Sequence, residues 1–401
     1  MLKSIFCLLI VVSVLSGCSS SRAPAAPATV AEITSPAGMG SEEPNLSAAP
    51  DGRVFMTWLE PASPEGYKLL FSTRDSKGTW SEPRMVAAGD NWFVNDADFP
   101  SMTVLSDGSL AAHWLANNEP GSEAYDVNIA ISHDGGATWG KPIVPHRDKT
   151  KSQHGFVSLV PAPGGRLNVI WLDGRKTNEE GEGDMAVMHA TIEPDGTLGA
   201  ETQLDNRACE CCQTSATATP DGMLVVYRDR SDQEIRDIYI VRYANGAWSK
   251  PEPLSKDGWE IDACPVNGPA ISSNGRNVSA AWFTAANDQV RVYAALSTDS
   301  GKTFGKPIQV DDGKANGRVD VLSLPSGGAL VTWMERAEKG AQIRIRQIDP
   351  NGVARPSIPV SGASGVRSGA FARMEWSGNQ AVIAWTDAGD EPHVKAAVLN
   401  F

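Results

Sequence analysis

Four cysteines and one histidine are the residues of this sequence whose types and spacing most directly suggest chemistry. Cys209, Cys211 and Cys212 are nearly adjacent, and Cys264 follows them further along the chain. Thiolate and imidazole are ligands that zinc and copper prefer, so these cysteines and His154 form a candidate metal site. In an oxidising compartment we expect two disulfides instead, one through Cys264 and one within the group of three. No cofactor is then needed, and a reactive thiol is a third alternative.

A second set of candidates consists of arginines and carboxylates that follow apolar segments. Guanidinium groups bind acidic ligands, and an aspartate beside them can transfer protons. The alternative is that these charges are solvated or form salt bridges between structural elements. The candidates are Asp173, Arg175, Arg228, Asp229, Arg318, Asp320, Arg336 and Arg367, with Glu60, Glu335 and Asp387 in similar positions.

The elements that must position these residues repeat along the chain. A strand ending in an aromatic residue recurs at intervals of 51 to 57 residues, each time after a turn of the Asp-Gly type. A polar loop and a third strand follow, and four repeats continue into an aromatic-x-x-Pro segment, which suits an edge strand. The aromatic residues are Trp58, Trp114, Trp171, Tyr227, Trp282, Trp333 and Trp385.

Four antiparallel strands per repeat, with no helical stretch between them, predict an all-β fold, a β-propeller of seven four-stranded blades. The seventh repeat stops after its third strand, so we expect residues 28–36 to supply its outer strand and close the ring. Six blades is the alternative if the last repeat packs irregularly. We place the domain at residues 31–401.

The repeat also predicts which residues meet on one face. Loops entering each inner strand gather around a propeller axis with the loops that follow each second strand. Counting back from each hairpin turn gives the ring position Ser41, Ala97, His154, Cys211, Cys264, Asn316 and Arg367. Three consecutive blades should therefore present a histidine and two cysteines. Trp92 and Trp259 fall between blades, where they either stack on sugar rings or cover the edge of the core.

Two turns between third and fourth strands share the motif Ser-x-Asp-x-Gly-x-Thr followed by an aromatic residue. The carboxylate can accept N–H groups of its own turn, glycine takes the positive φ, and the aromatic residue packs between sheets. The motif resembles the Asp box of sialidase-like propellers. Its residues here are Ser132, Asp134, Gly136, Thr138 and Trp139, and Ser297, Asp299, Gly301, Thr303 and Phe304.

This resemblance implies a propeller fold, glycan chemistry, and a catalytic face away from the boxes. Sialidases resemble retaining glycosidases with a tyrosine nucleophile, an aspartate acid/base and three arginines that hold the substrate carboxylate. The sequence has no arginine in the expected Phe/Tyr-Arg-Ile-Pro context, and no tyrosine is identifiable as the nucleophile. Tyr125 has only Glu119 or Glu123 as an evident partner, so no catalytic residue is transferred from the family.

The N-terminal residues 1–17 predict an export signal, with Lys3 ahead of an apolar run. Residues 15–18, Leu-Ser-Gly-Cys, resemble a bacterial lipobox, which implies cleavage before Cys18 and its diacylation. Residues 18–30 are small and Pro-containing and indicate a flexible tether. We expect a lipoprotein of the bacterial cell envelope, anchored in the outer membrane.

Composition limits the partners. Asp and Glu total 48 against 35 Lys and Arg, a net charge of −13 that disfavours nucleic acid and any membrane contact except through the lipid. We expect a propeller that binds an acidic glycan, with at most a sialidase-like hydrolase activity. The alternatives are a non-catalytic propeller that binds an envelope protein and a Cys/His metal-binding propeller. An enzyme requires at least two convergent arginines and a carboxyl pair.

Overall fold

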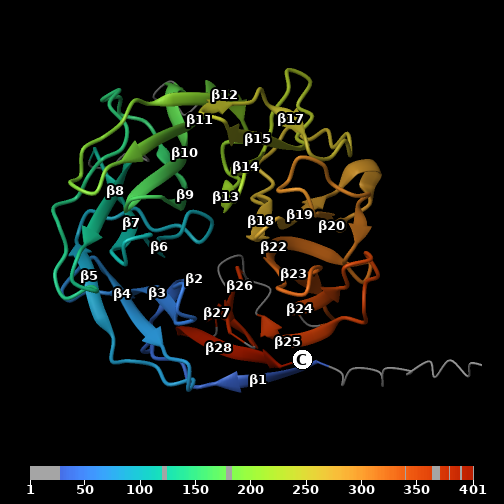
Figure 1. Cartoon of the computed structure of the whole chain (residues 1–401), viewed down its shortest axis with the longest axis horizontal. Helices are drawn as coiled ribbons and strands as arrows, with labels where there is room; N and C mark the ends of the chain where they lie inside the picture. Colours follow the sequence, from blue (N-terminus) through green and yellow to red (C-terminus); the bar gives the residue numbers. More distant parts are fainter. Residues whose placement is uncertain are drawn as a thin grey trace, which may run out of the picture.

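The computed structural model describes residues 28–119, 124–177, 183–338, 340–363, 371–378, 380–388 and 391–400. Their strands form seven antiparallel sheets around a common axis (Figure 1). Within these residues, the helical content is a single 3-10 turn, η1 (Ala286–Asp288). The predicted all-β propeller is confirmed with seven blades, and the six-bladed alternative is wrong.

The first three blades follow one another in chain order, each running outwards from the axis. Blade 1 contains β2 (Glu42–Ala48), β3 (Val54–Pro61), β4 (Tyr67–Arg74) and β5 (Arg84–Gly89). Blade 2 contains β6 (Ser101–Val104), β7 (Leu110–Asn117) and β8 (Tyr125–Ser132). Blade 3 contains β9 (His154–Ala162), β10 (Arg166–Thr177), β11 (Gly183–Ile192) and β12 (Thr202–Ala208). The outer segment of blade 2 pairs through a single bridge, Ile129 to Ile143, instead of a full strand.

Blades 4 to 6 continue the pattern. Blade 4 contains β13 (Ser215–Thr219), β14 (Gly222–Arg228), β15 (Ile238–Ala244), β16 (Ala247–Trp248) and β17 (Glu252–Pro253). Blade 5 contains β18 (Ala270–Asn274), β19 (Asn277–Thr284), β20 (Arg291–Ser297) and β21 (Ile308–Gln309). Blade 6 contains β22 (Ala315–Ser323), β23 (Ala329–Arg336), β24 (Ala341–Ile348) and β25 (Ile358–Ala363).

The last blade joins the two ends of the chain. It consists of β26 (Arg373–Ser377), β27 (Gln380–Ala388), β28 (Pro392–Asn400) and, outermost, β1 (Thr29–Ile33). The strand β1 pairs with β28 from Thr29 opposite Asn400 to Ile33 opposite Ala396. The predicted closure by an N-terminal strand is therefore confirmed.

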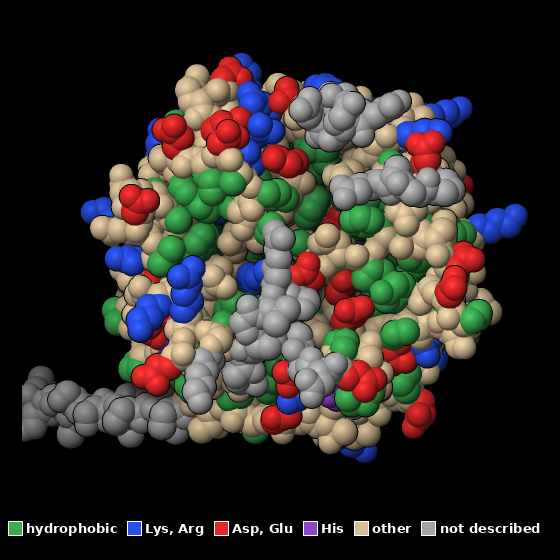
Figure 2. Space-filling model, turned by 180° about the vertical axis from the view of Figure 1, so that it is seen from behind, with side chains coloured by type: hydrophobic (Ala, Val, Ile, Leu, Met, Phe, Trp, Pro, Cys, Tyr) green, Lys and Arg blue, Asp and Glu red, His purple; other side chains and the backbone are tan. Residues whose placement is uncertain are grey.

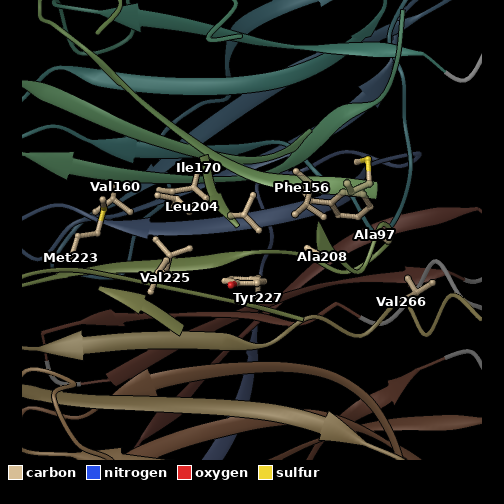
Figure 3. Packing of buried hydrophobic residues seen from close by; sticks show 14 residues of the cluster. Ala97, Phe156, Val160, Ile170, Leu204, Ala208, Met223, Val225, Tyr227 and Val266 are labelled. Atoms are coloured by element: carbon tan, nitrogen blue, oxygen red, sulfur yellow. The ribbon is translucent and has the colours of Figure 1, made fainter. Parts of the chain in front are cut away.

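The core lies between consecutive blades. Figure 3 shows the layer between blades 3 and 4, where Ile170 and Leu204 pack against Val225 and Tyr227. The aromatic residues of the repeat occupy these layers, and Trp58, Trp171, Tyr227, Trp282 and Trp385 have no exposed surface. Because every blade buries both faces, removing one side chain loosens two blades.

The Asp boxes form as predicted and fasten each blade to the one before it. In blade 2, the Asp134 carboxylate accepts the Thr138 N–H at 2.9 Å and its hydroxyl at 2.6 Å. These bonds and one from Ser132 hold the pKa of Asp134 well below its ordinary value. The ring of Trp139 meets Phe71 of blade 1 edge-on at 6.1 Å. The box is thus a structural device of the blade contact.

The box glycine should be more sensitive to substitution than an ordinary turn glycine. Gly301 has φ +73°, and a Cβ there would lie 2.3 Å from the Leu224 side chain of blade 4. Gly275 has a similar φ of +60° with open space around it. Gly275→Ala should cost about 1–2 kcal/mol through backbone strain alone, and Gly301→Ala about 1–3 kcal/mol more. Urea unfolding measures both, and equal losses would contradict a packing role for the box.

Candidate functional site

One face of the ring carries the loops that enter the inner strands and the loops that join second to third strands. Both sets of loops lie at the same ends of the strands, because antiparallel strands alternate in direction. Figure 2 shows acidic side chains gathered near the centre of the face turned away from the viewer of Figure 1. Three groups of chemically reactive side chains occur at these strand ends, and each draws on two or more blades.

The first group surrounds the axis, and we call it the mouth cluster. Its two arginines lie on phenylalanine rings, with the guanidinium of Arg318 4.5 Å from the ring of Phe371 and that of Arg373 5.2 Å from the ring of Phe99. The two rings are themselves 5.7 Å apart. Cation–π contact helps to hold each arginine in place. The mouth cluster comprises Glu42, Glu43, Asp96, Asp98, Phe99, Arg318, Phe371 and Arg373.

Carboxyl groups from blades 1 and 2 face these arginines. The Oδ2 atom of Asp96 lies 4.0 Å from Nη1 of Arg318. Burial, together with the nearby carboxylates of Glu42, Asp96 and Asp98, raises the pKa of Glu43 well above its ordinary value. Burial also raises the pKa of Asp98 to about 7. The mouth therefore combines buried carboxyl groups of raised pKa with two arginines.

The backbone near the mouth cluster departs from regular strand geometry, and this departure orients its side chains. Glu43, Phe156 and Arg318 have φ values of 55°, 53° and 57°, and the strand register shifts near each of them. A left-handed residue in a β-bulge turns its side chain out of the sheet. Non-glycine residues adopt this conformation at an energetic cost and are concentrated at functional sites.

Each left-handed residue is held by the preceding blade. The Phe156 N–H donates to Asp98 Oδ1 at 2.6 Å, and the Arg318 N–H donates to Asn267 Oδ1 at 2.7 Å. Gly155 and Gly317 come directly before these donors, and a Cβ on either would lie 2.0 Å from the acceptor side chain. The hydroxyl of Tyr125 also donates to Asp98, at 3.0 Å. Asp98 is therefore a positioning residue and a partner of Tyr125, while Glu123 lies outside the described residues.

Below the mouth, the inner strands enclose a polar channel of about 330 Å³. The candidate Asp320 lies here, where its Oδ2 accepts the Met374 N–H at 2.7 Å and its Oδ1 is 3.7 Å from Arg373 Nη1. Burial raises the pKa of Asp320, and it raises that of Glu375 to about 7. The channel wall thus continues the carboxyl character of the mouth.

The second group, the histidine cluster, lies between blades 2 and 3. The rings of His146 and His154 are stacked with centroids 3.7 Å apart, between the carboxylates of Asp126 and Asp148. His154 Nε2 is 3.2 Å from Asp148 Oδ2 and 3.8 Å from Asp173 Oδ1. Although burial opposes it, the bond to Asp148 and the charges of Asp173 and Asp126 raise the pKa of His154. His154 therefore lies among carboxylates. The structure does not group it with the cysteines as predicted.

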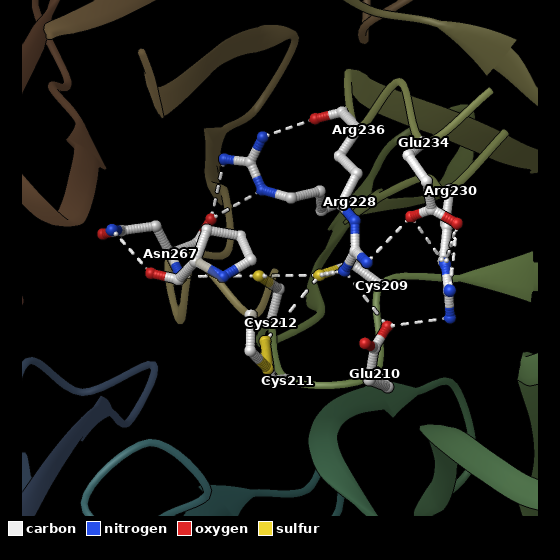
Figure 4. The surroundings of a disulfide bond; sticks show 11 residues. Cys209, Glu210, Cys211, Cys212, Arg228, Arg230, Glu234, Arg236 and Asn267 are labelled. Carbon is white, nitrogen blue, oxygen red and sulfur yellow. Dashed lines mark hydrogen bonds and ion pairs between the residues drawn. A yellow bond between two sulfur atoms is a disulfide. The ribbon is translucent and has the colours of Figure 1, made fainter. Parts of the chain in front are cut away.

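The third group, the cysteine cluster, joins blades 4 and 5 (Figure 4). Cys211 and Cys264 form a disulfide, as expected for one bridge between neighbouring blades. Cys209 and Cys212 are free thiols, with their sulfur atoms 3.2 Å apart. The predicted second disulfide within the cluster is therefore absent from this structure. Burial opposes ionisation of Cys209, but the bond with Cys212 and the charges of Arg228 and Arg236 lower its pKa to about 7.

Several sequence candidates have structural roles instead. The carboxylate two residues after the repeat tryptophan accepts its indole N–H, from Trp58 to Glu60 at 2.8 Å and from Trp171 to Asp173 at 2.7 Å. Trp333 donates to Glu335 in the same way. In these three repeats the carboxylate satisfies a buried indole, because an unpaired donor there would be costly. The candidate Asp387 instead pairs with Lys395 at 2.6 Å.

The remaining candidates are also accounted for by their contacts. Arg175 binds Asp173 through two nitrogens at 2.7 Å, and Arg228 is buried with its guanidinium on the carbonyls of Asn267, Arg236 and Phe283. Burial and the charge of Asp205 raise the pKa of Asp229 to about 7. Arg336 is exposed. Arg367 and Cys18 lie outside the described residues.

The two tryptophans between blades cover the core. Trp92 and Trp259 retain 9% and 7% of their surface, and Trp259 also receives the Arg228 guanidinium at 4.8 Å. Their proposed stacking on sugar rings is therefore wrong. In contrast, Glu43, Asp98 and Arg373 were not singled out from the sequence. A signal for Asp98 was present in its neighbour Phe99-Pro100, which marks the start of an inner strand.

Comparison with known proteins identifies the class of fold. No protein-family model matches the chain, and no curated protein matches it in sequence. The polysaccharide lyase Uly1 matches with a TM-score of 0.56 and 9% identity over 90% of each chain. An α-L-arabinanase of Penicillium chrysogenum in complex with arabinobiose matches with a TM-score of 0.53 and 13% identity, over 93% of this chain and 98% of that one.

A sialidase completes the comparison. The NanB sialidase of Streptococcus pneumoniae matches with a TM-score of 0.50 and 10% identity, over 93% of this chain and 94% of that one. The fold is therefore that of the sialidase-like seven-bladed β-propellers. At these identities the likeness concerns the fold, so the role of the site must come from its own residues.

The histidine cluster should make stability depend on pH. The folded pKa of His154 lies above the ordinary 6.5, so its contribution is complete below about pH 6.5 and is lost as the pH rises through the folded value. The pKa of Asp148 is lowered, since its bonds with His146 and His154 outweigh burial, and its contribution is lost only as the pH falls through that low value. Thermal melting is measured from about pH 4 to about pH 9 for the parent and for His154→Gln. Raising the pH above about 6.5 should lower the melting temperature of the parent more than that of the variant. A constant difference across that range would contradict the assignment.

Proposed function

We propose that the protein binds an acidic glycan at the mouth cluster and hydrolyses it. The observation that carries this proposal is that Arg318 and Arg373 stack on the adjacent rings of Phe371 and Phe99, while the Asp96 carboxylate lies 4.0 Å from Arg318 and close to Glu43. Guanidinium groups recognise carboxylates and sulfates through paired hydrogen bonds. Their stacking on Phe371 and Phe99 fixes them before a ligand arrives, which lowers the entropic cost of binding.

The carboxyl groups have complementary protonation requirements. Glu43 is buried, its pKa is raised, and its Oε2 atom has no hydrogen-bond partner in the structure. We assign it as the acid that gives its proton to the leaving glycosidic oxygen. Asp96 faces Arg318 at 4.0 Å and is the carboxylate that removes a proton from the attacking water. The glycosidic C–O bond breaks, and water supplies the oxygen of the new hydroxyl.

The fold neighbours support a glycan as the ligand. They include an arabinanase bound to arabinobiose, a sialidase and a polysaccharide lyase. The Asp boxes lie at the opposite ends of the strands and leave the mouth free for substrate. An acidic sugar is favoured over a neutral one because guanidinium groups bind a carboxylate or sulfate through paired hydrogen bonds.

The test is binding and turnover on matched acidic and neutral oligosaccharides with the full-length protein in detergent. We expect acidic glycans to bind, Arg373→Met to weaken binding by about tenfold, and Glu43→Gln to lower turnover by about a hundredfold while binding remains. Arg53→Met removes an exposed arginine at a hairpin turn and is the matched control.

The products distinguish the chemistry. New reducing ends without a double bond support hydrolysis, whereas unsaturated products would overturn it in favour of elimination. Equal binding of neutral glycans, or no glycan binding by the intact protein, would overturn the acidic-glycan proposal and favour the alternative of a protein-binding propeller.

We also propose that the protein is a lipoprotein of the bacterial outer membrane, acylated at Cys18. In the described residues, no helix is long and apolar enough to cross a membrane. The support is the Leu-Ser-Gly-Cys sequence after an apolar run. Mass spectrometry of the mature N-terminus should find a diacylated cysteine, and Cys18→Ser should move the protein from the membrane to the soluble fraction. A parent protein that is soluble and starts elsewhere would contradict this assignment.

A further inference from the structure

The cysteine cluster gathers four sulfur atoms from two blades in a very small volume. Cys209 Sγ lies 3.2 Å from Cys212 Sγ and 3.9 Å from Cys211 Sγ, and Cys211 is bonded to Cys264. The first three come from the loop that leads into β13, and Cys264 comes from the loop that leads into β18. Cys209 and Cys212 are 0% and 1% exposed, whereas Cys211 is half-buried and Cys264 is exposed, so solvent reaches the cluster from the side of the disulfide.

Hydrogen-bond donors around the cysteine cluster can stabilise negatively charged sulfur atoms. The guanidinium of Arg236 is only 1% exposed, and its Nη1 donates to Cys209 Sγ at 3.2 Å. On the other side, the Asn267 N–H donates to Cys212 Sγ at 3.4 Å. Figure 4 shows both donors directed at the sulfur atoms. N–H groups that point at sulfur are the outer contacts typical of metal-bound thiolates.

A second disulfide explains these donors poorly. Nη1 of the buried Arg236 contacts both Cys209 Sγ and Glu210 Oε2, and its Nη2 lies 2.9 Å from Glu234 Oε2. The sulfur atoms of a disulfide carry no charge, so a Cys209–Cys212 bond would weaken the contacts from Arg236 and from the Asn267 N–H to sulfur, while the two carboxylates kept the guanidinium paired. Thiolates are strong acceptors for both donors, and a bound cation neutralises the excess negative charge of four thiolates.

We propose that the four cysteines, when all are reduced, bind one soft metal ion with filled d orbitals, Zn(II) or Cu(I), between blades 4 and 5. Four thiolates are the set used by closed structural sites for such ions. Opening the Cys211–Cys264 disulfide takes two electrons and two protons, which an external dithiol supplies as it becomes a disulfide itself. Metal binding then releases the thiol protons. His154 is not a ligand, because it is held by Asp148 and Asp173 in the histidine cluster.

The experiment is metal reconstitution of the full-length protein, reduced under anaerobic conditions, with Zn(II) and Cu(I) tested separately. Elemental analysis should give about one ion per chain in the reduced protein and much less after oxidation. Cobalt in place of zinc should show the spectrum of a tetrahedral thiolate site. Whichever of the two ions survives competition with a chelator of known affinity identifies the metal.

Variants separate the site from general folding. Cys212→Ser and Cys264→Ser should each lose the stoichiometric ion, and Arg236→Gln should weaken binding by about tenfold. His154→Gln should bind as the parent does, which distinguishes four cysteines from a Cys/His set. Far-ultraviolet circular dichroism of the metal-free variants checks that the propeller remains folded.

Reduced parent protein that binds neither ion, or a folded Cys212→Ser variant that binds as tightly as the parent, would overturn the proposal. Glycan binding at the mouth is measured on the same preparations. It should persist in Cys212→Ser, so failure of the metal site and failure of the proposed glycan site give different results.

Discussion

The geometry of the mouth cluster depends on hydrogen bonds between the backbone of an inner strand and a side chain of the blade before it. Where Phe156 and Arg318 adopt left-handed geometry, their N–H groups leave the strand ladder and are accepted by Asp98 and Asn267 of the preceding blade. A glycine before each of them lets the acceptor approach. The same bonds that hold neighbouring blades together therefore fix where side chains enter the mouth. Fold and site cannot vary independently here.

Much of the fold was predictable because it rests on local, repeated signals. The recurring aromatic residues, the Asp-Gly turns and the two Asp boxes each report a short-range requirement, and ring closure followed from counting strands. The incomplete outer strand of blade 2 was not predictable, because its Trp139-Gly-Lys-Pro segment has the same pattern as complete edges elsewhere. Tertiary pairing decides strand length more than residue type does.

The site was less predictable, since its residues come together from distant repeats. Asp173 and Glu335 are candidates from the sequence because they follow strands, yet both accept the indole N–H of a repeat tryptophan. Glu43 and Arg318 enter the mouth only because of a backbone bulge, which has no sequence signature apart from Gly317 before Arg318. His154 and Cys211 shared a predicted ring position, but His154 contacts His146 and Asp148 whereas Cys211 is bonded to Cys264.

The direction of β1 has a consequence for how the molecule is presented. In the pairing with β28, Thr29 lies opposite Asn400, at the ends of the strands that carry the Asp boxes in other blades, while Ile33 leads towards the mouth. The outer strand of the last blade therefore begins at the strand ends opposite the mouth cluster. If the protein is lipid-anchored as proposed, its point of attachment to the ring and its mouth are at opposite ends of the strands, so the anchor does not compete with large polymers for access to the arginines and carboxyls.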